Sequence, residues 1–327
     1  MKKFISVIVP NHNGSATIGK CLEAAFASAY ENFEVVVVDD CSSDNSTSII
    51  KRFPCRLIEL KTHAGAAKAR NEGALAGKGE VFFFTDADCL LQANSLALAN
   101  SAINEAGTDA VIGGTYTRLP LDKDFFSTFQ SIFIHYSEAK NCERPDYIAT
   151  HAMIISAETF RRFDGFKEDF MPILEDVEFS HRLYRGGCRL LMDPEITVRH
   201  IFAFTLKKSF LNAYRKARYW TIYSIRNRDM LADSGTASRE LKVNGISYLA
   251  CLLFLLLSVV TLDSAWLIMA AVFTGLNIFA GRGLLAQFRK TGGPLFALKA
   301  ALYYLLLYPL PVLAGSLSGV MEYARHR

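Results

Sequence analysis

The chain has 327 residues, enough for one large domain with an appendage or for two ordinary domains. Its hydrophobic share of 51% is high for a soluble protein, so the placement of the apolar residues becomes the deciding observation. The net charge of +4 hides a split, because 15 of the 36 Lys and Arg but only 5 of the 32 Asp and Glu lie beyond His200. An acidic first part joined to a basic, apolar second part indicates an anionic membrane surface as the partner, and it argues against nucleic acid.

The seven cysteines are odd in number and include no Cys-x-x-Cys pair, so we expect reduced thiols. The strand-like run FISVIVP begins three residues after Met1 and leaves no room for the apolar core and cleavage site of a signal peptide. We therefore expect the catalytic part to stay in the cytosol, on an inner (plasma) membrane of the bacterial type.

In chain order, short apolar runs rich in β-branched residues alternate with helix-compatible segments. The strand-like runs are ISVIVP from Ile5, FEVVVVDD from Phe33 and EVFFFTDAD from Glu80. The helix-compatible segments between them cover 19–29, 46–52 and 66–76. Nearly all-apolar strands alternating with helices are typical of parallel strands covered on both faces. The sequence therefore predicts an α/β fold with a doubly wound, mostly parallel sheet.

Segments rich in carboxylate and amide side chains stand where each predicted strand ends. They are Pro10-Asn11-His12-Asn13, Asp39-Asp40 and Asp86-Ala87-Asp88. Ligands of such sheets bind outside the carboxyl ends of the strands, so we expect these residues to form one site. A second stretch, from about Gly114 to His200, contains Glu175-Asp176 and should complete it. The predicted catalytic domain covers residues 1–200.

The Asp86-Ala87-Asp88 segment has two interpretations. Two carboxylates at a strand end are hard oxygen ligands for a divalent cation. An Asp after a strand is also the common amino-terminal cap of the next helix. The tripeptide alone does not decide between them.

The motifs SVIVPNHN, VVVVDDCSSDNS, HAGAAKARNEGALA, FTDADC and LEDVEFSHRLYRGG occur in this order along the chain. Over residues 4 to 200, this ordered set resembles the family 2 glycosyltransferases of the nucleotide-sugar-binding A-type fold. The resemblance implies a nucleotide-sugar donor, with a uridine nucleotide as the default. The positions that it places in the nucleotide pocket are Pro10, Asn11, Asp39, Asp40, Arg70 and Asp86. It also implies that Asp86 and Asp88 bind the donor diphosphate through Mn²⁺ or Mg²⁺.

In the same family, the Asp of the Glu175-Asp176 pair is the general base that deprotonates the acceptor hydroxyl for in-line, inverting attack. Glu175 then orients the acceptor or supports Asp176, although the sequence leaves an exchange of roles open. Both acids would also suit the first turn of a helix through the macrodipole.

The histidines have mixed interpretations. His200 matches a position at which some members of this family place a third metal ligand, and a structural role is the alternative. His12 lies in the donor loop and is left undecided. The histidines at 63, 135, 151, 181 and 326 are predicted to be structural.

Residues 201–242 interleave Phe, Tyr and Trp with Lys and Arg. This pattern predicts amphipathic helices lying on a membrane surface. The alternative is an ordinary solvated helix pair packed on the catalytic domain.

Residues 243–327 contain three stretches without charge. Asn244–Leu262 and Ser264–Ala280 predict a helical hairpin, and Arg282, Arg289 and Lys290 after it fit the positive-inside rule. The third stretch, Ala300–Met321, contains two prolines and predicts either a kinked span or a re-entrant pair of short helices. We therefore expect two to three spans.

A sugar-transfer site beside a membrane anchor suggests a lipid-linked or other glycolipid acceptor, in contact with membrane lipids. A processive polymer synthase is not expected, because KARYW at Lys216 departs from the Gln-x-x-Arg-Trp motif of such enzymes. A nucleotidyltransferase would carry a basic, glycine-rich loop where this chain has PNHNGSAT. The other alternative is a non-catalytic membrane scaffold with a sugar-nucleotide-binding domain.

Overall fold

The computed structural model describes residues 1–325, so His326 lies outside the described part of the chain. The chain forms two compact units. The first consists of Met1–Lys123 and Glu138–Phe202, and the second of Asp124–Ser137 and the residues from Ala203 onward.

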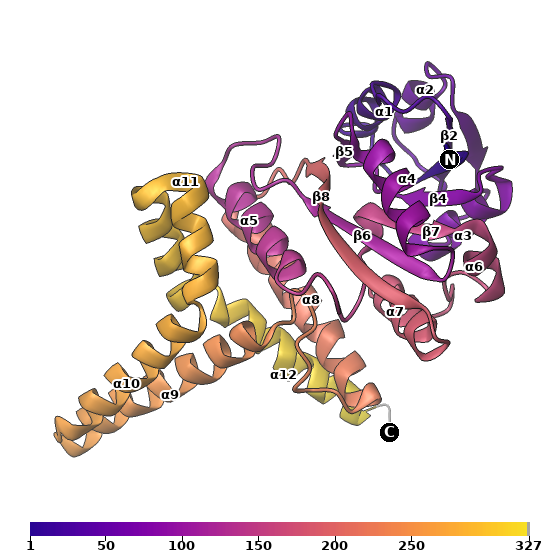
Figure 1. Cartoon of the computed structure of the whole chain (residues 1–327). Coiled ribbons are helices and arrows are strands. Elements are labelled where there is room, and N and C mark those ends of the chain that lie inside the picture. Colours follow the sequence, from indigo (N-terminus) through magenta and orange to yellow (C-terminus); the bar gives the residue numbers. More distant parts are fainter. Residues whose placement is uncertain (326–327) are drawn as a thin grey trace. The chain divides into compact units, whose positions relative to one another are not determined.

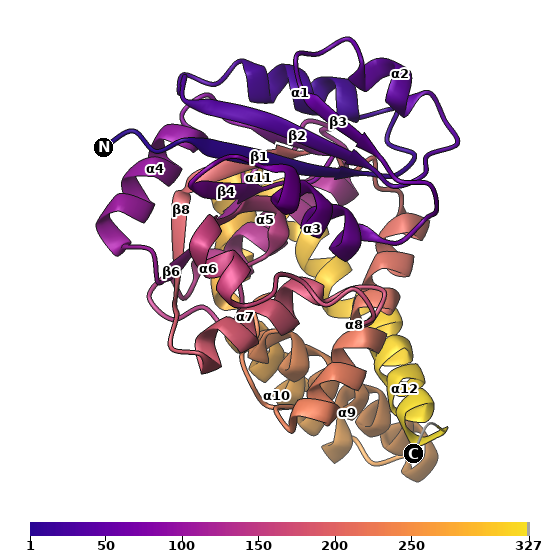
Figure 2. The same cartoon turned by 90° about the vertical axis from the view of Figure 1, so that its right-hand side faces the viewer.

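Within the described residues, the first unit contains one eight-stranded sheet with the order β3-β2-β1-β4-β7-β6-β8-β5 (Figures 1 and 2). The strands are β1 (Ile5–Asn11), β2 (Phe33–Asp39), β3 (Arg56–Glu59), β4 (Val81–Phe84), β5 (Cys89–Leu91), β6 (Ala110–Tyr116), β7 (Met153–Ser156) and β8 (Arg189–His200). Strands β1 to β4 pair in parallel, as do β6 and β8, whereas β7 is antiparallel to both of its neighbours and β5 is antiparallel to β8. The predicted α/β fold with a mostly parallel sheet is confirmed.

Helices cover both faces of this sheet. They are α1 (Ile18–Phe26), α2 (Ser46–Ile50), α3 (Ala66–Ala76), α4 (Ser95–Ala106), the 3₁₀ turn η1 (Thr150–Ala152), α6 (Ala157–Arg162) and α7 (Glu175–Arg185). Helices α1 and α2 lie on one face of β1, β2 and β3, and α3 lies on the other (Figure 2). A side chain at Gly73 of α3 would place its Cβ 2.5 Å from Ile8 Cγ2, so this glycine permits the close approach of α3 to β1.

The core beneath α6 and α7 is aromatic. Phe82 and Phe84 of β4 pack with Phe160, Phe166 and Phe179, with ring centroids 4.8–6.1 Å apart. All five side chains are buried, and burying each contributes about 1.5–3 kcal/mol. This cluster fixes the loop that precedes α7.

The second unit is helical. Its elements are α5 (Phe125–Ala139, whose last two residues belong to the first unit), α8 (Leu206–Asn227), α9 (Arg239–Thr261), α10 (Ala265–Ala280), α11 (Arg282–Leu302), the π-helix η2 (Tyr303–Leu307) and α12 (Pro309–Arg325). The predicted basic and aromatic stretch forms one helix, α8, rather than a pair.

Helices α8 and α12 lie along each other (Figures 1 and 2). Gly315 and Gly319 of α12 face the backbone of α8, because an added Cβ would lie 2.3 Å from the Tyr214 carbonyl and 2.5 Å from the Arg218 carbonyl. Small residues four apart allow helix backbones to approach closely. Arg218 also donates to Glu322 at 2.5 Å. The third apolar stretch is therefore paired along a charged helix.

Helices α9 and α10 form the predicted hairpin. The Phe254 and Trp266 rings stack at 5.7 Å, and the buried Asn244 side chain donates to Asn277 and to the Tyr304 carbonyl. Elsewhere the hairpin exposes its apolar side chains, such as Leu256 and Val260 at 60% and 69%. Such an exposed apolar surface is unusual for a protein in water.

Two helical segments are long and apolar enough to cross a membrane, Arg239–Thr261 and the run Arg282–Arg325. Ala265–Ala280 is apolar but shorter. The run from Arg282 is kinked at Gly293, where φ is +79°, and contains the π-turn in which Tyr308 N–H donates to the Tyr303 carbonyl. Pro309 and Pro311 both lie in the first turn of α12, where the backbone N–H groups have no partner within the helix. A missing N–H is tolerated there, so the chain stays helical through both prolines.

Candidate active site

The side chains at the ends of β1 and β2 are hydrogen-bonded to each other. Asn11 Nδ2 donates to Asp39 Oδ1 at 2.7 Å, and Asp39 also accepts from the Ser42 N–H and hydroxyl at 2.9 and 2.6 Å. Asn11 and Asp39 are both buried, and Pro10 is half-buried beside them at the end of β1. A Cβ on Gly14 would lie 2.3 Å from Asn11 Oδ1 and 3.6 Å from Ala87 Cβ. The loop after β1 therefore lies against the Asp86-Ala87-Asp88 segment.

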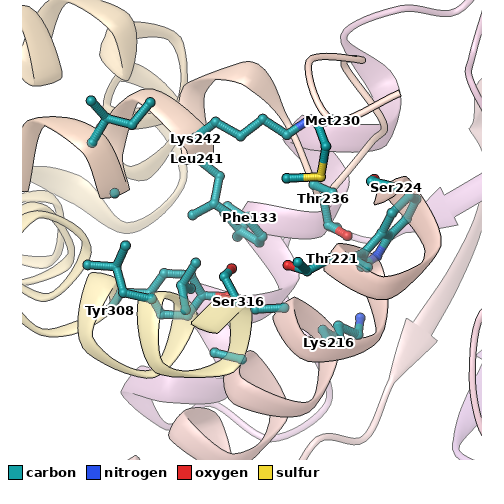
Figure 3. A pocket seen from close by; sticks show the side chains of 18 of the residues that line it. Phe133, Lys216, Thr221, Ser224, Met230, Thr236, Leu241, Lys242, Tyr308 and Ser316 are labelled. Atoms are coloured by element: carbon teal, nitrogen blue, oxygen red, sulfur yellow. The ribbon is translucent and has the colours of Figure 1, made fainter. Parts of the chain in front are cut away.

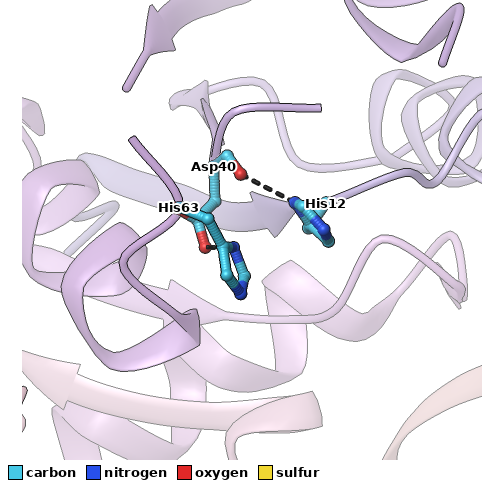
Figure 4. Close-up of side chains that lie close together, drawn as sticks. All are labelled: His12, Asp40 and His63. Carbon is cyan, nitrogen blue, oxygen red and sulfur yellow. Dashed lines mark hydrogen bonds and ion pairs between the residues drawn. The ribbon is translucent and has the colours of Figure 1, made fainter. Parts of the chain in front are cut away.

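Asp40 holds the loop that leads into α3. Its carboxylate accepts from the N–H groups of Ala64 and Gly65 at 2.7 and 2.8 Å, and His63 Nδ1 lies 2.9 Å from it. His12 Nδ1 lies 2.7 Å from the Asp40 carbonyl oxygen, and the two imidazole rings are 4.2 Å apart (Figure 4). Three donors already satisfy the Asp40 carboxylate, so this cluster positions the loop rather than holding a metal.

Arg70 joins two acidic motifs that lie far apart in the sequence. Its Nη2 donates to Asp86 at 2.7 Å and its Nη1 to Glu175 at 2.6 Å. The Arg70 side chain is 5% exposed. Burial opposes the charge of the guanidinium, but the two carboxylates outweigh it and raise the pKa of Arg70. Burial likewise acts to raise the pKa of Asp86, and the Arg70 charge and hydrogen bond reverse this and lower it.

Asp88 and His200 face each other across the pairing of β5 with β8. Asp88 Oδ1 lies 3.4 Å from His200 Nε2, and Cys89 places a third possible ligand atom within 4.8 Å of both. Burial and the neighbouring Asp86 charge raise the pKa of Asp88 to about 7. Two carboxylates that repel each other beside an imidazole form a donor set that suits Mn²⁺ or Mg²⁺, because a divalent cation would relieve the repulsion.

A stack of rings fixes the orientation of His200. Its ring stacks on Phe202 at 3.9 Å and meets the Tyr116 ring edge at 4.9 Å. On its other side, Tyr116 lies 4.1 Å from the ring of His151, whose Nε2 is 3.3 Å from Glu138 Oε2. Burial acts to lower the pKa of His151, but Glu138 outweighs it and raises the pKa.

His151 and Glu138 were not expected at the site. The sequence predicts a structural role for His151 and no role for Glu138, which also accepts from Thr115 at 2.7 Å. The charges of Asp86 and Asp176 also act to raise the pKa of His151, which couples it to the acidic residues of the site. Neither residue stands in a motif with a recognisable spacing, so no sequence signal pointed to them.

Asp176 is the second residue of α7, two positions after Leu174, which adopts a left-handed conformation with φ of +75°. Its carboxylate accepts from the Val177 N–H at 2.9 Å and from the Thr150 N–H at 3.4 Å. Burial and the adjacent Glu175 charge raise the pKa of Asp176 to about 6. The neighbouring Glu175 is instead held by Arg70.

All the residues predicted for the site lie in the first unit, most of them at strand ends or in the loops that follow. The model of the family "Glycosyl transferase family 2" matches residues 6–170.

The chain belongs to glycosyltransferase family 2. Glycosyltransferase GlyG of Streptococcus pneumoniae serotype 4 is 32% identical over 222 residues, which cover 65% of this chain and 69% of GlyG. The Escherichia coli protein WfgD, a UDP-Glc:alpha-D-GlcNAc-diphosphoundecaprenol beta-1,3-glucosyltransferase, is 34% identical over 97 residues, covering 29% of this chain and 38% of WfgD.

The fold is also found in a solved structure. Mannosyltransferase PcManGT from Pyrobaculum calidifontis, solved in complex with GDP-Man and Mn²⁺, matches 98% of this chain and 88% of its own, with a TM-score of 0.61 and 18% identity. The predicted family and its nucleotide-sugar-binding fold are therefore confirmed. This glycosyltransferase acts on a nucleotide sugar.

Proposed function

We propose that this glycosyltransferase transfers a sugar to a lipid-linked acceptor with inversion of configuration, and that Asp176 is the general base. The observation that carries the proposal is the different environment of the two adjacent acids. Arg70 donates to Glu175 at 2.6 Å and neutralises its charge, whereas the Asp176 carboxylate accepts from two backbone N–H groups. A pKa of about 6 leaves Asp176 ionised at neutral pH but basic enough to take a proton.

In this mechanism, Asp176 removes the proton from the acceptor hydroxyl as its oxygen attacks the anomeric carbon. The bond from that carbon to the donor diphosphate breaks in the same step, and the nucleoside diphosphate leaves. A single displacement from the opposite face inverts the configuration. Arg70 keeps Glu175 and Asp86 in place through its two hydrogen bonds, which makes it a positioning residue.

Asn11, Asp39 and Asp40 would bind the nucleoside of the donor, with a UDP-sugar as the default. The buried network around Asp39 presents a preorganised polar wall, which supports this assignment. The rings of His12 and His63 are both exposed at the loop that Asp40 holds, and they offer flat faces on which a base could stack (Figure 4).

Asp86, Asp88 and His200 would hold a Mn²⁺ or Mg²⁺ ion. Bound there, the cation supplies charge neutralisation for the departing diphosphate. The mutual repulsion of Asp86 and Asp88 supports the assignment, as does the placement of His200 by the Phe202 and Tyr116 rings. The Mn²⁺ in the PcManGT complex is consistent with it.

The membrane anchor of this proposal is the α9–α10 hairpin. Only 17% of the residues in the most apolar stretch of α9 are buried, and at about 1.5 Å per residue α9 is roughly 35 Å long. Residues 1–200 would form the cytosolic catalytic domain and 243–327 the membrane domain. Residues 201–242, which include the charged α8, would lie at the interface, and α12 would be the part of the membrane domain that pairs with α8 there.

The acceptor would then lie in the plasma membrane. The name of WfgD includes a diphosphoundecaprenol acceptor, which supports a lipid-linked acceptor for this chain too. The positive charges after the hairpin, Arg282, Arg289 and Lys290, support a cytosolic position of the catalytic domain.

The test is transfer by the full chain in nanodiscs, with a panel of nucleotide sugars, with and without Mn²⁺. Asp176→Asn should lower kcat by about 10²–10⁴ while nucleotide binding persists. Asp169→Asn is the matched control, because Asp169 is an exposed acid a few residues earlier. The anomeric configuration of the product is read by NMR.

Four results would contradict the proposal. Undiminished turnover in Asp176→Asn would refute the base assignment. Retained configuration would refute the single displacement. Full activity after chelation would refute the metal, and failure to bind any nucleotide would favour the scaffold.

A further inference from the structure

The second unit contains a cavity of about 300 Å³, and none of the residues assigned to the catalytic site lines it. It lies among α5, α8, α12, the start of α9 and the segment 228–238, and Figure 3 shows the side chains that line it. Most of the lining is apolar and includes Phe133, Trp220, Leu241, Tyr308, Val312 and Leu313. A volume near 300 Å³ is at the lower end for cavities that bind small ligands.

The polar part of the lining has one sign of charge. Lys216 of α8 and Lys242 of α9 contribute their side chains, and Thr221, Thr236 and Ser316 add hydroxyl groups (Figure 3). None of the described residues that line the cavity carries a carboxylate. Both lysines are half-buried, and Lys242 Nζ also donates to the Ala232 carbonyl. An apolar cavity with two cations and no anion suits an amphiphile with an anionic head.

The cavity lies at the start of α9, where charged residues are followed by an uncharged, apolar stretch. Lys242 is the last charged residue of α9 before a run that stays uncharged until Asp263. Around the cavity, Met230, Leu231 and Ile246 are 45%, 81% and 64% exposed. Apolar side chains exposed beside lysines at the start of a membrane helix are typical of the headgroup region. An amphiphile could therefore enter this cavity from the bilayer.

We propose that this cavity binds the acceptor lipid, with a prenyl-type phosphate beside Lys216 and Lys242 and the first part of its chain against Trp220 and Tyr308. The proposal deepens the transfer to a lipid-linked acceptor and rests on it. The small volume favours a lipid with one chain next to the phosphate over a phospholipid with two chains. Phosphate contacts from the two lysines would fix the depth of the lipid in the membrane.

The experiment measures binding of a fluorescent prenyl phosphate to the full chain in nanodiscs of neutral lipid. Thr221→Phe fills the cavity, and Lys216→Glu reverses one of its charges. Both should weaken binding at least 10-fold. The matched controls on α8 are Leu211→Phe and Lys207→Glu, because both residues are exposed and neither lines the cavity. Each control should change binding less than 2-fold.

Two results would overturn the proposal. Wild-type binding in Lys216→Glu and in a monodisperse Thr221→Phe protein would show that the lipid binds elsewhere. Displacement of the probe by an equal concentration of phosphatidylglycerol would assign the cavity to bulk phospholipid.

The same variants separate this inference from the proposed function. If the cavity variants transfer sugar to the lipid acceptor with the wild-type KM, the cavity proposal fails and the function stands. If no acceptor receives sugar while probe binding still depends on Lys216 and Thr221, the function fails and the cavity stands. If both the cavity proposal and the proposed function are correct, Lys216→Glu and Thr221→Phe should raise KM for a lipid acceptor at least 10-fold and leave nucleotide-sugar binding unchanged.

Discussion

Replacing Arg70 with Met tests whether the link between Asp86 and Glu175 holds the site together. The substitution keeps an unbranched side chain but removes the charge and both hydrogen bonds, at 2.7 and 2.6 Å. Removing one partner of a buried ion pair costs about 3–5 kcal/mol, because the remaining charge is left without a partner. Here Asp86 and Glu175 are 32% and 14% exposed, so water partly solvates them. We therefore expect a loss of about 3 kcal/mol, at the lower end of that range.

The assay is unfolding of the full chain in detergent, followed by circular dichroism and by the melting temperature. A loss of about 3 kcal/mol should lower Tm by roughly 6–12 °C for a unit of this size. Arg70→Lys should recover part of the loss, since one ammonium keeps the charge but cannot reach both carboxylates as a fork does. Arg185→Met, at an exposed arginine near the end of α7, should stay within about 0.5 kcal/mol of the parent.

The reasoning would be refuted if Arg70→Met unfolded like the Arg185→Met control. It would also fail if Arg70→Lys were no better than Arg70→Met, because the loss would then come from packing rather than from charge.

Three further predictions concern the base and the helix pair. Ionised Asp176 is the active form, so kcat/KM should rise with pH through about 6; a profile flat from pH 5 to 8 would contradict this. The pKa of Asp176 is higher in the folded chain than in the unfolded chain, so ionisation of its carboxyl group lowers the free energy of unfolding as pH rises toward 6. Asp176→Asn should therefore have a higher Tm than the parent at pH 8 but not at pH 4. Gly319→Leu should cost about 1–3 kcal/mol, because its Cβ would meet the Arg218 carbonyl at 2.5 Å, whereas Gly275→Leu, with nothing within 4 Å, should be neutral in a thermal melt.

Much of the first unit could be predicted from the sequence. The runs that begin at Ile5, Phe33 and Glu80 contain β1, β2 and β4, and the Ala-rich segment 66–76 is helix α3. These elements could be predicted because the apolar run of a buried strand and the helix-forming residues of a helix are recognisable within a few neighbouring residues. The convergence of Asn11, Asp39 and Asp86 follows from the parallel pairing of β1 with β2 and β4, since parallel strands end at one edge.

The antiparallel strands β5 and β7 were harder to predict. Strand β5 has only three residues, Cys89–Leu91, and its pairing with β8 brings Asp88 to His200. A three-residue strand carries no periodicity that a sequence pattern can detect. The proximity of Asp88 and His200 could therefore be suggested by family resemblance but not by the residues themselves.

By itself, the sequence determined the order of strands and helices, the acids at the strand ends and the charge-free lengths of the carboxy-terminal helices, because each depends on neighbouring residues. Only the tertiary structure decided that Arg70 reaches Glu175, 105 residues away, and so leaves Asp176 as the acid not paired with arginine. It also decided that α12 pairs along α8 through Gly315 and Gly319. These contacts depend on how distant segments pack, and a linear pattern contains no measure of that distance.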